Sequence, residues 1–578
     1  MILSPQPADG RPLMLTLCSA ILASTLTLGP SPSQGATPSE PAVLSVRAFG
    51  AKGDGRTLDT DAVNRAISAA AAAGGGIVSF RAGQYLCHSI RLRSHVSIHI
   101  GPGATIVAAD PPPEGQPGGY DPAEPNAWSE YQDFGHSHWH NSLIWGEDLE
   151  DVSITGPGRI DGRGLSRGNG RISLPVNITA PTAPGDPLPD VLSADGPVTF
   201  PARPDLVAGP FGYPNARDTL PDGIGNKAIA LKGCRNVTLR DFSVLHGGHF
   251  AILATGVDNL TIDNLRIDTN RDGIDIDACR NVRISNTSVN SPWDDGICLK
   301  SSHALGERRV TENVTITGCV VSGYDEGSLL DGTRQRRLRR RGGPMGRIKL
   351  GTEAGGGFRN IAISSCVFDY CRGIALEQVD GGVLEDVVIA NVTMRDVPNA
   401  PVFVRLGGRL RAPGATRPGV VRGVTIDGLD ATGVAAGQGI FVAGVPGHPV
   451  DELLLSNVRI RFAGGGTREQ AEREVPELEK GYPEPLAFGV LPSWGLFARH
   501  AAGLVVRGMD LGIDAPDARP AILLEDVAGA RFSDVALGTS PGSSLWSLAN
   551  VTGLLARDTA GLPDGKQADV GERPAIDE

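Results

Sequence analysis

The chain of 578 residues has few cysteines, no zinc-binding pattern and little that could span a membrane. Its eight cysteines are too few for the dense disulfide framework of small secreted domains. No Cys-x-x-Cys pair and no Cys/His zinc spacing is present. Beyond the N-terminal segment, no stretch is apolar enough to form a spanning helix of roughly 20 residues. These absences argue against a disulfide scaffold, a zinc module and a membrane span in the body of the chain.

The N-terminus carries a targeting pattern. An apolar stretch over residues 13–28 is followed by Gly29-Pro30 and small residues up to Ala36, which resembles the hydrophobic and cleavage regions of a secretory signal. A membrane anchor is the alternative, but the apolar run is shorter than a span requires. We predict a signal peptide over residues 1–36 and a secreted or periplasmic mature protein without a membrane span.

The charge balance is acidic, with a formal net charge of -12. The one strongly basic segment, residues 334–341, contains six arginines and could attract an acidic polymer, or could be solvated loop charge. One basic loop on an acidic chain is weak evidence for nucleic-acid binding, so no nucleic-acid partner is expected.

A short phrase recurs along the chain, in which Asn or Asp precedes alternating apolar residues. Its clearest copies begin at residues 236, 259, 281, 313, 360 and 386, and the tightest intervals between them are 23, 22 and 26 residues. Each copy is too small to bury its own apolar face, so the copies must stack to form one core. The pattern predicts an all-β fold, a right-handed, single-stranded parallel β-helix.

The composition and the flanking segments agree with a solenoid. Glycine makes up 77 of 578 residues, about 13%, against an average of roughly 7%, as expected for coils with several tight corners. An Ala-rich helix over residues 64–73 is expected to cover the open end of the stack. We predict an N-terminal cap with the first strands over 45–90, the β-helix over 91–545 and a C-terminal tail over 546–578.

Two loops rich in proline and glycine, residues 110–142 and 175–222, interrupt the early coils. Long loops in a compact domain often form walls or lids. The first loop contains His136, His138 and His140 at alternating positions, which leaves open a metal site or hydrogen bonding to a ligand. Cys319 and Cys366 each follow a repeat asparagine by six residues and should stack, as inward-facing thiols rather than as a disulfide.

Two acidic motifs, Asn270-Arg271-Asp272-Gly273 and Trp293-Asp294-Asp295-Gly296, are separated by 23 residues, one repeat length. Stacking would place Asp272 beside Asp295, because adjacent strands lie roughly 4.8 Å apart. Carboxylates this close cannot all ionise freely, and the resulting split in acidity suits the acid and base of glycoside hydrolysis. A Ca²⁺ site and a purely structural use of the aspartates are the alternatives.

These motifs resemble those of glycoside hydrolase family 28, the polygalacturonase family. That family carries Asn-Thr-Asp, Asp-Asp, Gly-His-Gly and Arg-Ile-Lys in this order. Here Arg271 replaces the Thr, the Asp-Asp pair is intact, and Glu326 in Tyr324-Asp325-Glu326-Gly327 stands near the expected His. The fourth motif fits either Arg347-Ile348-Lys349 or, if Gly351-Thr352-Glu353 follows the third motif, the segment from Arg372 to Glu377. The resemblance covers about residues 45–470.

The resemblance implies the roles of the site residues. Asp294 would be the general acid, and Asp272 and Asp295 would hold the attacking water, in an inverting mechanism. Arg347 and Lys349 would bind a uronic acid carboxylate in one alignment, whereas Glu377 would replace the family Lys in the other. The remaining substrate-binding candidates are Glu326, Lys300, Glu353, Arg372 and His249.

The sequence therefore predicts a monomeric, secreted hydrolase of α-1,4-galacturonosyl linkages in pectic polysaccharide, with no cofactor and no metal. Three alternatives stay open: a hydrolase of rhamnogalacturonan or another glycan at the same site, a Ca²⁺-dependent polysaccharide lyase, and a noncatalytic carbohydrate-binding β-helix. The acidic residues at Glu326 and Glu377 bear on the choice, because they would repel a galacturonate carboxylate unless nearby cations neutralise them.

Overall fold

The computed structural model describes residues 42–113, 116–133, 135–166, 220–337 and 342–571, and the backbone of residues 192–193 and 196–197. The predicted signal peptide, most of the predicted loop over 175–222 and four residues of the basic segment lie outside the described residues. Residues from 42 onward form one compact unit by themselves. Among the described residues, no helix combines the length and the apolar character that crossing a membrane requires.

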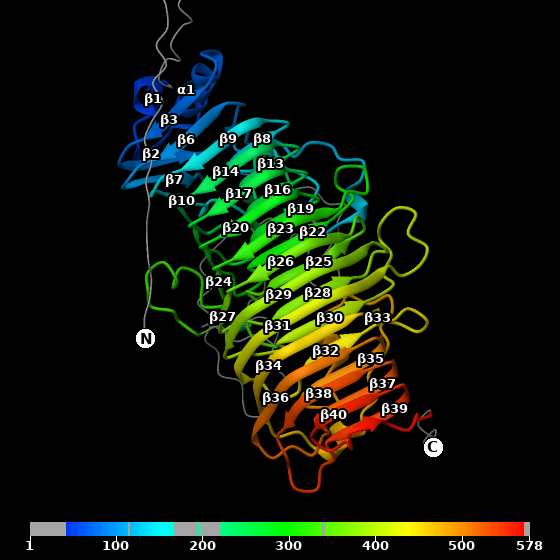
Figure 1. The fold of residues 1–578 in the computed structure, drawn as a ribbon. Coiled ribbons are helices and arrows are strands. Elements are labelled where there is room, and N and C mark those ends of the chain that lie inside the picture. The colour runs from blue at the N-terminus through cyan, green and yellow to red at the C-terminus, as the bar shows by residue number, and fades with distance from the viewer. Residues whose placement is uncertain are drawn as a thin grey trace, which may run out of the picture. The chain divides into compact units, whose positions relative to one another are not determined.

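The described chain winds into stacked coils whose strands pair in parallel with the strands of the next coil (Figure 1). This confirms the predicted parallel β-helix, built as three columns of strands. Column A contains β5 (Ile90–Arg91), β8 (Ile144–Glu147), β13 (Lys227–Lys232), β16 (Phe250–Thr255), β19 (Asp272–Asp277), β22 (Ile297–Ser301), β25 (Ile348–Ala354), β28 (Ile374–Gln378), β30 (Val402–Leu406), β32 (Ile440–Ala443), β35 (Leu496–Ala502), β37 (Ile522–Ala528) and β39 (Trp546–Thr552).

Column B follows column A in each coil, and column C follows column B. Column B contains β1 (Val43–Ser45), β3 (Gly76–Phe80), β6 (Val96–Ile100), β9 (Glu150–Thr155), β14 (Arg235–Arg240), β17 (Asp258–Asp263), β20 (Arg280–Ser285), β23 (Thr311–Thr317) and β26 (Phe358–Ser364). Column C contains β2 (Asp54–Leu58), β4 (Gly83–Cys87), β7 (Ala104–Ala108), β10 (Arg159–Asp161), β15 (Ser243–Leu245), β18 (Arg266–Asp268), β21 (Ser288–Asn290), β24 (Val320–Ser322) and β27 (Val367–Asp369).

Later coils merge the last two columns into long strands. These are β29 (Val383–Arg395), β31 (Val420–Val434), β34 (Leu453–Gly464), β36 (Val505–Ala515), β38 (Arg531–Leu537) and β40 (Leu555–Thr559), with the short β33 (Val450–Asp451) between β31 and β35. Outside the columns lie β41 (Gly565–Lys566), which is antiparallel to β40, the hairpin β11 (Leu192–Ser193) and β12 (Gly196–Pro197), and the short helices η1 (Val46–Phe49), η2 (Ser129–Tyr131), α2 (Arg468–Ala471) and η3 (Pro485–Phe488).

The N-terminal end of the stack is covered by α1 (Thr60–Ala72), beside β1 and β3 (Figure 1). Its buried face is formed by Ala62, Val63, Ala66, Ile67 and Ala70. The predicted capping helix is confirmed, although it begins four residues earlier than expected. Strands of successive coils pair from β3 and β4 onward, within the predicted cap and first strands, and pairing continues through β39 and β40.

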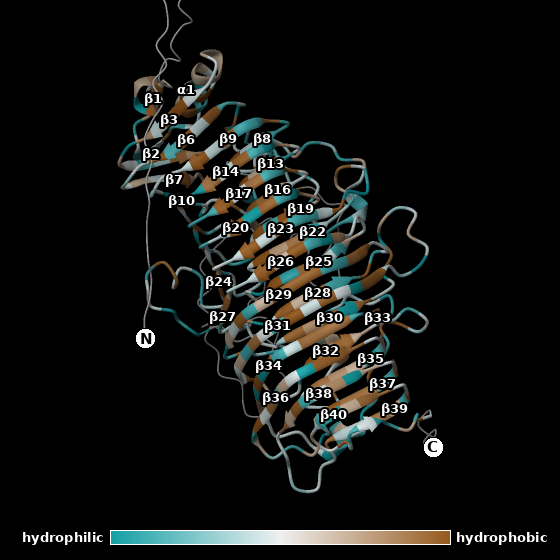
Figure 2. Ribbon diagram, viewed as in Figure 1, coloured by the Kyte–Doolittle hydropathy of each residue, from teal (hydrophilic) through white to brown (hydrophobic). Residues whose placement is uncertain are grey.

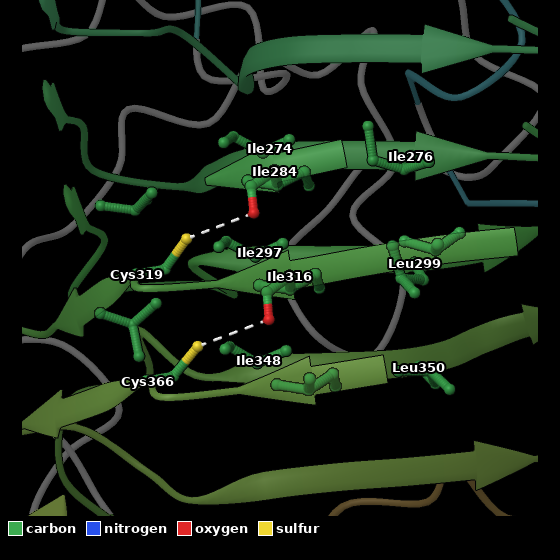
Figure 3. Packing of buried hydrophobic residues seen from close by; sticks show 14 of the residues in the cluster. Ile274, Ile276, Ile284, Ile297, Leu299, Ile316, Cys319, Ile348, Leu350 and Cys366 are labelled. Atoms are coloured by element: carbon green, nitrogen blue, oxygen red, sulfur yellow. Dashed lines mark hydrogen bonds between the residues drawn. The ribbon is translucent and has the colours of Figure 1, made fainter. Parts of the chain in front are cut away.

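Inward-facing apolar residues stack from coil to coil and fill the core, and apolar segments recur along the strands (Figure 2). Ile274 pairs with Ile297 and then with Ile348, while Ile276, Leu299 and Leu350 form a second row. Cys319 and Cys366 lie on neighbouring coils beside these rows, and their thiols donate to the carbonyl oxygens of Ile284 and Ile316 (Figure 3). Both are buried and free, as predicted.

The repeat asparagines form a corner ladder. Asn236, Asn259, Asn281, Asn313 and Asn360 all have φ between 54° and 59°, the left-handed region that asparagine tolerates better than most residues. Neighbouring side chains are hydrogen-bonded, as when Asn259 donates to Asn236 at 2.9 Å and Asn360 donates to Asn313 at 2.8 Å. The recurring sequence pattern thus marks the left-handed corner of each coil as well as the alternating core residues.

Candidate active site

Three carboxylates meet where the chain enters column A. Asp272 is the first residue of β19, and Asp294 and Asp295 lie in the turn before β22. The Gly273 amide donates to the Asp295 carbonyl at 3.0 Å, which places the two motifs on adjacent coils as predicted. One oxygen of each carboxylate lies within 4.8 Å of the other two. The Asp294 side chain is 18% exposed, against 5% for Asp272 and 1% for Asp295, so Asp294 is the accessible member.

Cations neutralise two of the three carboxylates. Arg271 Nη2 lies 2.6 Å from Asp294 Oδ2. Arg347 Nε donates to Asp295 Oδ1 at 2.8 Å, and Lys349 Nζ lies 2.6 Å from Asp295 Oδ2. The replacement of the family Thr by Arg271 therefore gives Asp294 a charged partner on the coil below it.

The surroundings shift the pKa values of Asp272 and Asp295 in opposite directions. Burial, and then the charges of Asp294 and Asp275, raise the pKa of Asp272 well above its ordinary value. Burial would also raise the pKa of Asp295, but Lys349 and Arg347 outweigh it and hold that pKa well below the ordinary value. The pKa values of Asp272 and Asp295 are therefore shifted in opposite directions, and carboxyl groups of unlike acidity are what acid–base chemistry needs.

The strand register decides between the two alignments of the later motifs. Cys298 of β22 pairs with Lys349 of β25, and Lys349 pairs with Ala375 of β28. The coil after the Asp-Asp pair therefore carries Arg347-Ile348-Lys349 followed by Gly351-Thr352-Glu353, and the segment from Arg372 to Glu377 lies on the next coil. This agrees with the second alignment, in which Glu377 is on the fourth coil.

The same register corrects the placement of Glu326. Tyr324-Asp325-Glu326-Gly327 was expected to supply the third motif, with Glu326 near the position of its His, but it lies in the loop after β24, because β25 is the strand that pairs with β22 in column A. The buried Asp268 carboxylate anchors this loop by accepting from the backbone amides of Gly327, Leu329 and Leu330 at 2.9–3.0 Å. Glu326 acts electrostatically on His246, one coil before Asp272.

Glu377 lies beside Arg347 and Lys349, the two cations of the preceding coil. Its side chain is buried, neither carboxyl oxygen has a hydrogen-bond partner, and Arg347 Nη2 is 3.7 Å from Oε1. Burial raises the pKa of Glu377 to about 7, against the opposing charges of Lys349 and Arg347. Near neutral pH this group is therefore protonated in a large fraction of molecules.

The other predicted binding residues occupy three places. Arg372 Nη1 lies 2.5 Å from Glu484, which also lies 3.4 Å from Arg347 and comes from the loop between β34 and β35. Lys300 Nζ lies 3.2 Å from Glu353 and 3.6 Å from Asp275. His249 is buried next to Phe250, the residue that pairs with Asp272 on the preceding coil.

The three histidines of the first loop have separate partners. His136 Nε2 lies 3.1 Å from Asp275, His138 Nδ1 lies 2.8 Å from the Glu124 carbonyl oxygen, and His140 Nε2 lies 2.7 Å from Glu147. They do not converge on a shared metal position. Within the described ranges, the acidic trio is the one group found with the proximity of a metal site, and Arg271, Arg347 and Lys349 already supply it with positive charge.

Several neighbours of the site gave no usable signal in the sequence. Asp133, Arg411 and Glu484 reach the site from loops, where no repeat predicts their position. Asp275 is different, because it follows Asp272 by three residues on the same strand. Its outward position could have been read from the alternation in Asp272-Gly273-Ile274-Asp275.

Family models match two parts of the chain. Residues 222–337 match a right-handed β-helix region, and residues 43–106 match a model described as rhamnogalacturonase A/epimerase, pectate lyase-like. A curated exo-poly-α-D-galacturonosidase of Dickeya chrysanthemi is 25% identical over 276 residues, which are 45% of this chain and 42% of that protein. The chain thus matches less than half the length of this relative.

Two solved structures share the fold. The family 28 exopolygalacturonase of Yersinia enterocolitica aligns with a TM-score of 0.55 and 19% identity, covering 92% of this chain and 79% of that one. An exopolygalacturonase of Thermotoga maritima aligns with a TM-score of 0.53 and 20% identity, covering 73% and 89%. At these identities the likeness shows the architecture, and the chemistry must be argued from the site.

Proposed function

The chain resembles the polygalacturonase-like proteins of glycoside hydrolase family 28, and from this resemblance we propose that it is a glycoside hydrolase of pectic polysaccharide. The specific proposal is inverting hydrolysis of α-1,4-galacturonosyl linkages by a secreted or periplasmic enzyme. The observation that carries it is the acidic trio, in which one oxygen of each carboxylate lies within 4.8 Å of the other two, with the pKa of Asp272 raised and that of Asp295 lowered. Glycosidases require such a pair of unlike carboxyl groups.

The reaction needs one proton donor and one proton acceptor. Asp294 is the accessible carboxyl of the trio, so we assign it the role of the general acid, which carries the proton given to the glycosidic oxygen. The proton then passes to the leaving oxygen as its bond to C1 breaks. A water molecule forms the new bond to C1 from the opposite face and gives its proton to the carboxylate pair Asp272 and Asp295. One water is consumed, and both products end in hydroxyl groups.

The charge balance suits an acidic sugar. Four cations gather around the carboxylates of the site: Arg271, Arg347, Lys349 and Arg372. The raised pKa of Glu377, about 7, reduces the negative charge that would otherwise repel a uronate. The repulsion expected from Glu377 is therefore reduced near neutral pH, which favours galacturonate over a neutral sugar.

Cleavage at a chain end is the mode of action that we propose. The three relatives described above carry exo-acting names. Loops also cover the outward face of column A on both sides of the site, which supports the same mode. On the N-terminal side Trp139 packs against Phe250 and Leu253. On the C-terminal side Phe488 packs against Phe403 and Phe441.

A Ca²⁺-dependent lyase is the second candidate, because three close carboxylates are a possible cation site. Arg271, Arg347 and Lys349 already neutralise two of them, which disfavours a divalent cation there. Chelator therefore discriminates the two functions: a lyase would lose activity, and the hydrolase would keep it.

The test is incubation of the mature protein with polygalacturonate and with rhamnogalacturonan, with and without chelator. New reducing ends and the absorbance of unsaturated products are followed together. We expect reducing ends without unsaturation, insensitive to chelator, and a loss of about 10³-fold in Asp294→Asn. Asp396→Asn, which alters a partly exposed aspartate that pairs with Arg336 and does not belong to the acidic trio, is the matched control. Unsaturated, chelator-sensitive product would replace the hydrolase with the lyase.

A further inference from the structure

The first loop, described over residues 116–133 and 135–142 and called here the 116–142 loop, packs against the outward face of column A on the N-terminal side of the acidic trio. Trp139 is fully buried beneath it, where its indole nitrogen donates to Thr255 at 3.1 Å and Lys232 lies 4.6 Å from its ring. At its far side, Asn126 donates to the Ala304 carbonyl at 2.9 Å. The loop thus begins beside column C and reaches the segment that follows β22.

A closed ring of polar contacts fastens this loop next to the site. His136 Nε2 lies 3.1 Å from Asp275 Oδ2, which lies 3.6 Å from Lys300 Nζ. The ring continues from Lys300 to Glu353 at 3.2 Å, from Glu353 to Arg411 at 2.7 Å and from Arg411 to Asp133 at 2.6 Å. It closes through His136 Nδ1, 3.2 Å from the Asp133 carbonyl oxygen.

One half of the ring is buried on the strands and the other half is partly exposed on loops. Asp275, Lys300 and Glu353 stand on three successive strands of column A and are at most 5% exposed. Burial alone would raise the pKa of Glu353, but Lys300 and Arg411 hold it well below the ordinary value. Asp133 and Arg411 lie on loops, with side chains 43% and 26% exposed. The Asp133–Arg411 pair is therefore the link that joins two loops across the outward face of column A.

We propose that the Asp133–Arg411 bridge determines chain-end specificity, by holding the loop over residues 116–142 across the path that a continuous polysaccharide would take along column A. This rests on the proposed function and names the residues that impose its mode of action. With the bridge closed, a sugar chain reaches Asp294 only by its end. With the bridge open, the face of column A beside Asp272 accepts the interior of a chain.

The position of the bridge makes the effect separable from catalysis. Neither Asp133 nor Arg411 contacts the acidic trio in the ion pairs described, and the buried Lys300–Glu353 pair remains when Asp133 is removed. A partly exposed ion pair contributes little to global stability. Its loss should therefore loosen one loop while the coils stay folded.

The test compares viscosity with reducing ends during hydrolysis of polygalacturonate by the full mature chain. In the wild type, reducing ends should appear with little loss of viscosity. In Asp133→Ala, and in Arg411→Ala, the loss of viscosity per reducing end should rise about fivefold. A fivefold change corresponds to about 1 kcal/mol in the equilibrium between the closed and the open loop. Asp133→Glu should retain the wild-type ratio, because it keeps the carboxylate.

Two further measurements make the result decisive. Arg422→Ala removes a 2.6 Å pair with Glu385 on column B and should leave the ratio unchanged. Chymotrypsin should cut at Trp128 or Tyr131 faster in Asp133→Ala than in the wild type, whatever the activity. Unchanged products in an active Asp133→Ala, or internal cleavage by the wild type, would overturn the inference. A wild type that hydrolyses no pectic polymer would instead contradict the proposed function.

Discussion

Arg271 Nη2 lies 2.6 Å from Asp294 Oδ2, so a guanidinium on one coil pairs with the accessible carboxylate of the next. The same guanidinium lies 4.0 Å from Asp272 Oδ2. Burial, and then the charges of Asp294 and Asp275, raise the pKa of Asp272 well above its ordinary value. Arg271 therefore contacts both the proposed general acid and the neighbouring carboxyl whose pKa is raised.

Replacing Arg271 by Thr should lower activity on polygalacturonate, because it removes the guanidinium that lies 2.6 Å from the proposed general acid Asp294. We expect kcat/KM to fall about tenfold, as for the loss of a hydrogen bond to a charged group. Arg280→Thr, which removes a 3.2 Å surface pair with Glu312, should leave kcat/KM unchanged. An unchanged kcat/KM in Arg271→Thr would show that Arg271 does not position Asp294.

Glu377 should make the protein less stable as the pH rises. Its pKa is about 7 in the folded protein, against an ordinary glutamate value of 4.5, so the folded state binds the proton more tightly than the unfolded chain. The resulting stability is fully present below pH 4.5 and is lost as the pH rises through about 7, a change of about 3 kcal/mol. Urea unfolding between about pH 5 and pH 8 measures it.

The matched variant for this effect is Glu377→Gln, which cannot titrate. Its free energy of unfolding should show a pH dependence smaller by about 3 kcal/mol over that range. Glu469→Gln, which alters an exposed carboxyl in the first turn of α2, should behave as the wild type. Equal slopes in the wild type and Glu377→Gln would show that Glu377 is ionised when the protein folds.

Asp268 should control the order of the loop that carries Glu326. Its carboxylate accepts from three backbone amides of that loop, and hydrogen bonds to charged groups contribute roughly 1.5–3 kcal/mol. In Asp268→Asn, trypsin should cut at Arg334, Arg336 or Arg337 at least about tenfold faster. Asp331→Asn, in the same loop with Thr333 as its partner, should cut at the wild-type rate. Equal rates would mean that other contacts hold the loop.

The stacked thiols should stay reduced and protected. Cys319 and Cys366 are buried, and each donates to a carbonyl oxygen of the neighbouring coil at 3.8 Å. A thiol reagent should therefore react with the native protein at least about 10²-fold more slowly than with the urea-unfolded protein. Mass analysis without reductant should show no Cys319–Cys366 crosslink. Finding that crosslink would restore the disulfide alternative.

The sequence by itself determined the repeat, and with it the architecture and the stacking of the acidic motifs. Apolar alternation requires a buried row on every coil, and Ile274, Ile297 and Ile348 can form that row in only one register. That register places Asp272 beside Asp295 and Arg271 beside Asp294. Local periodicity was sufficient because each coil contacts mainly its neighbours.

Only the tertiary structure decided what surrounds the carboxylates. Glu326 lies in the loop between β24 and β25 and not in a stacked strand. The sequence could not show this, because an insertion has no fixed length and a short motif does not reveal which coil it belongs to. Loops also bring Asp133 to Arg411 and Glu484 to Arg372 over more than a hundred residues of chain. Burial and charge at each carboxyl depend on these long-range contacts, so the electrostatic surroundings of the trio followed from the fold.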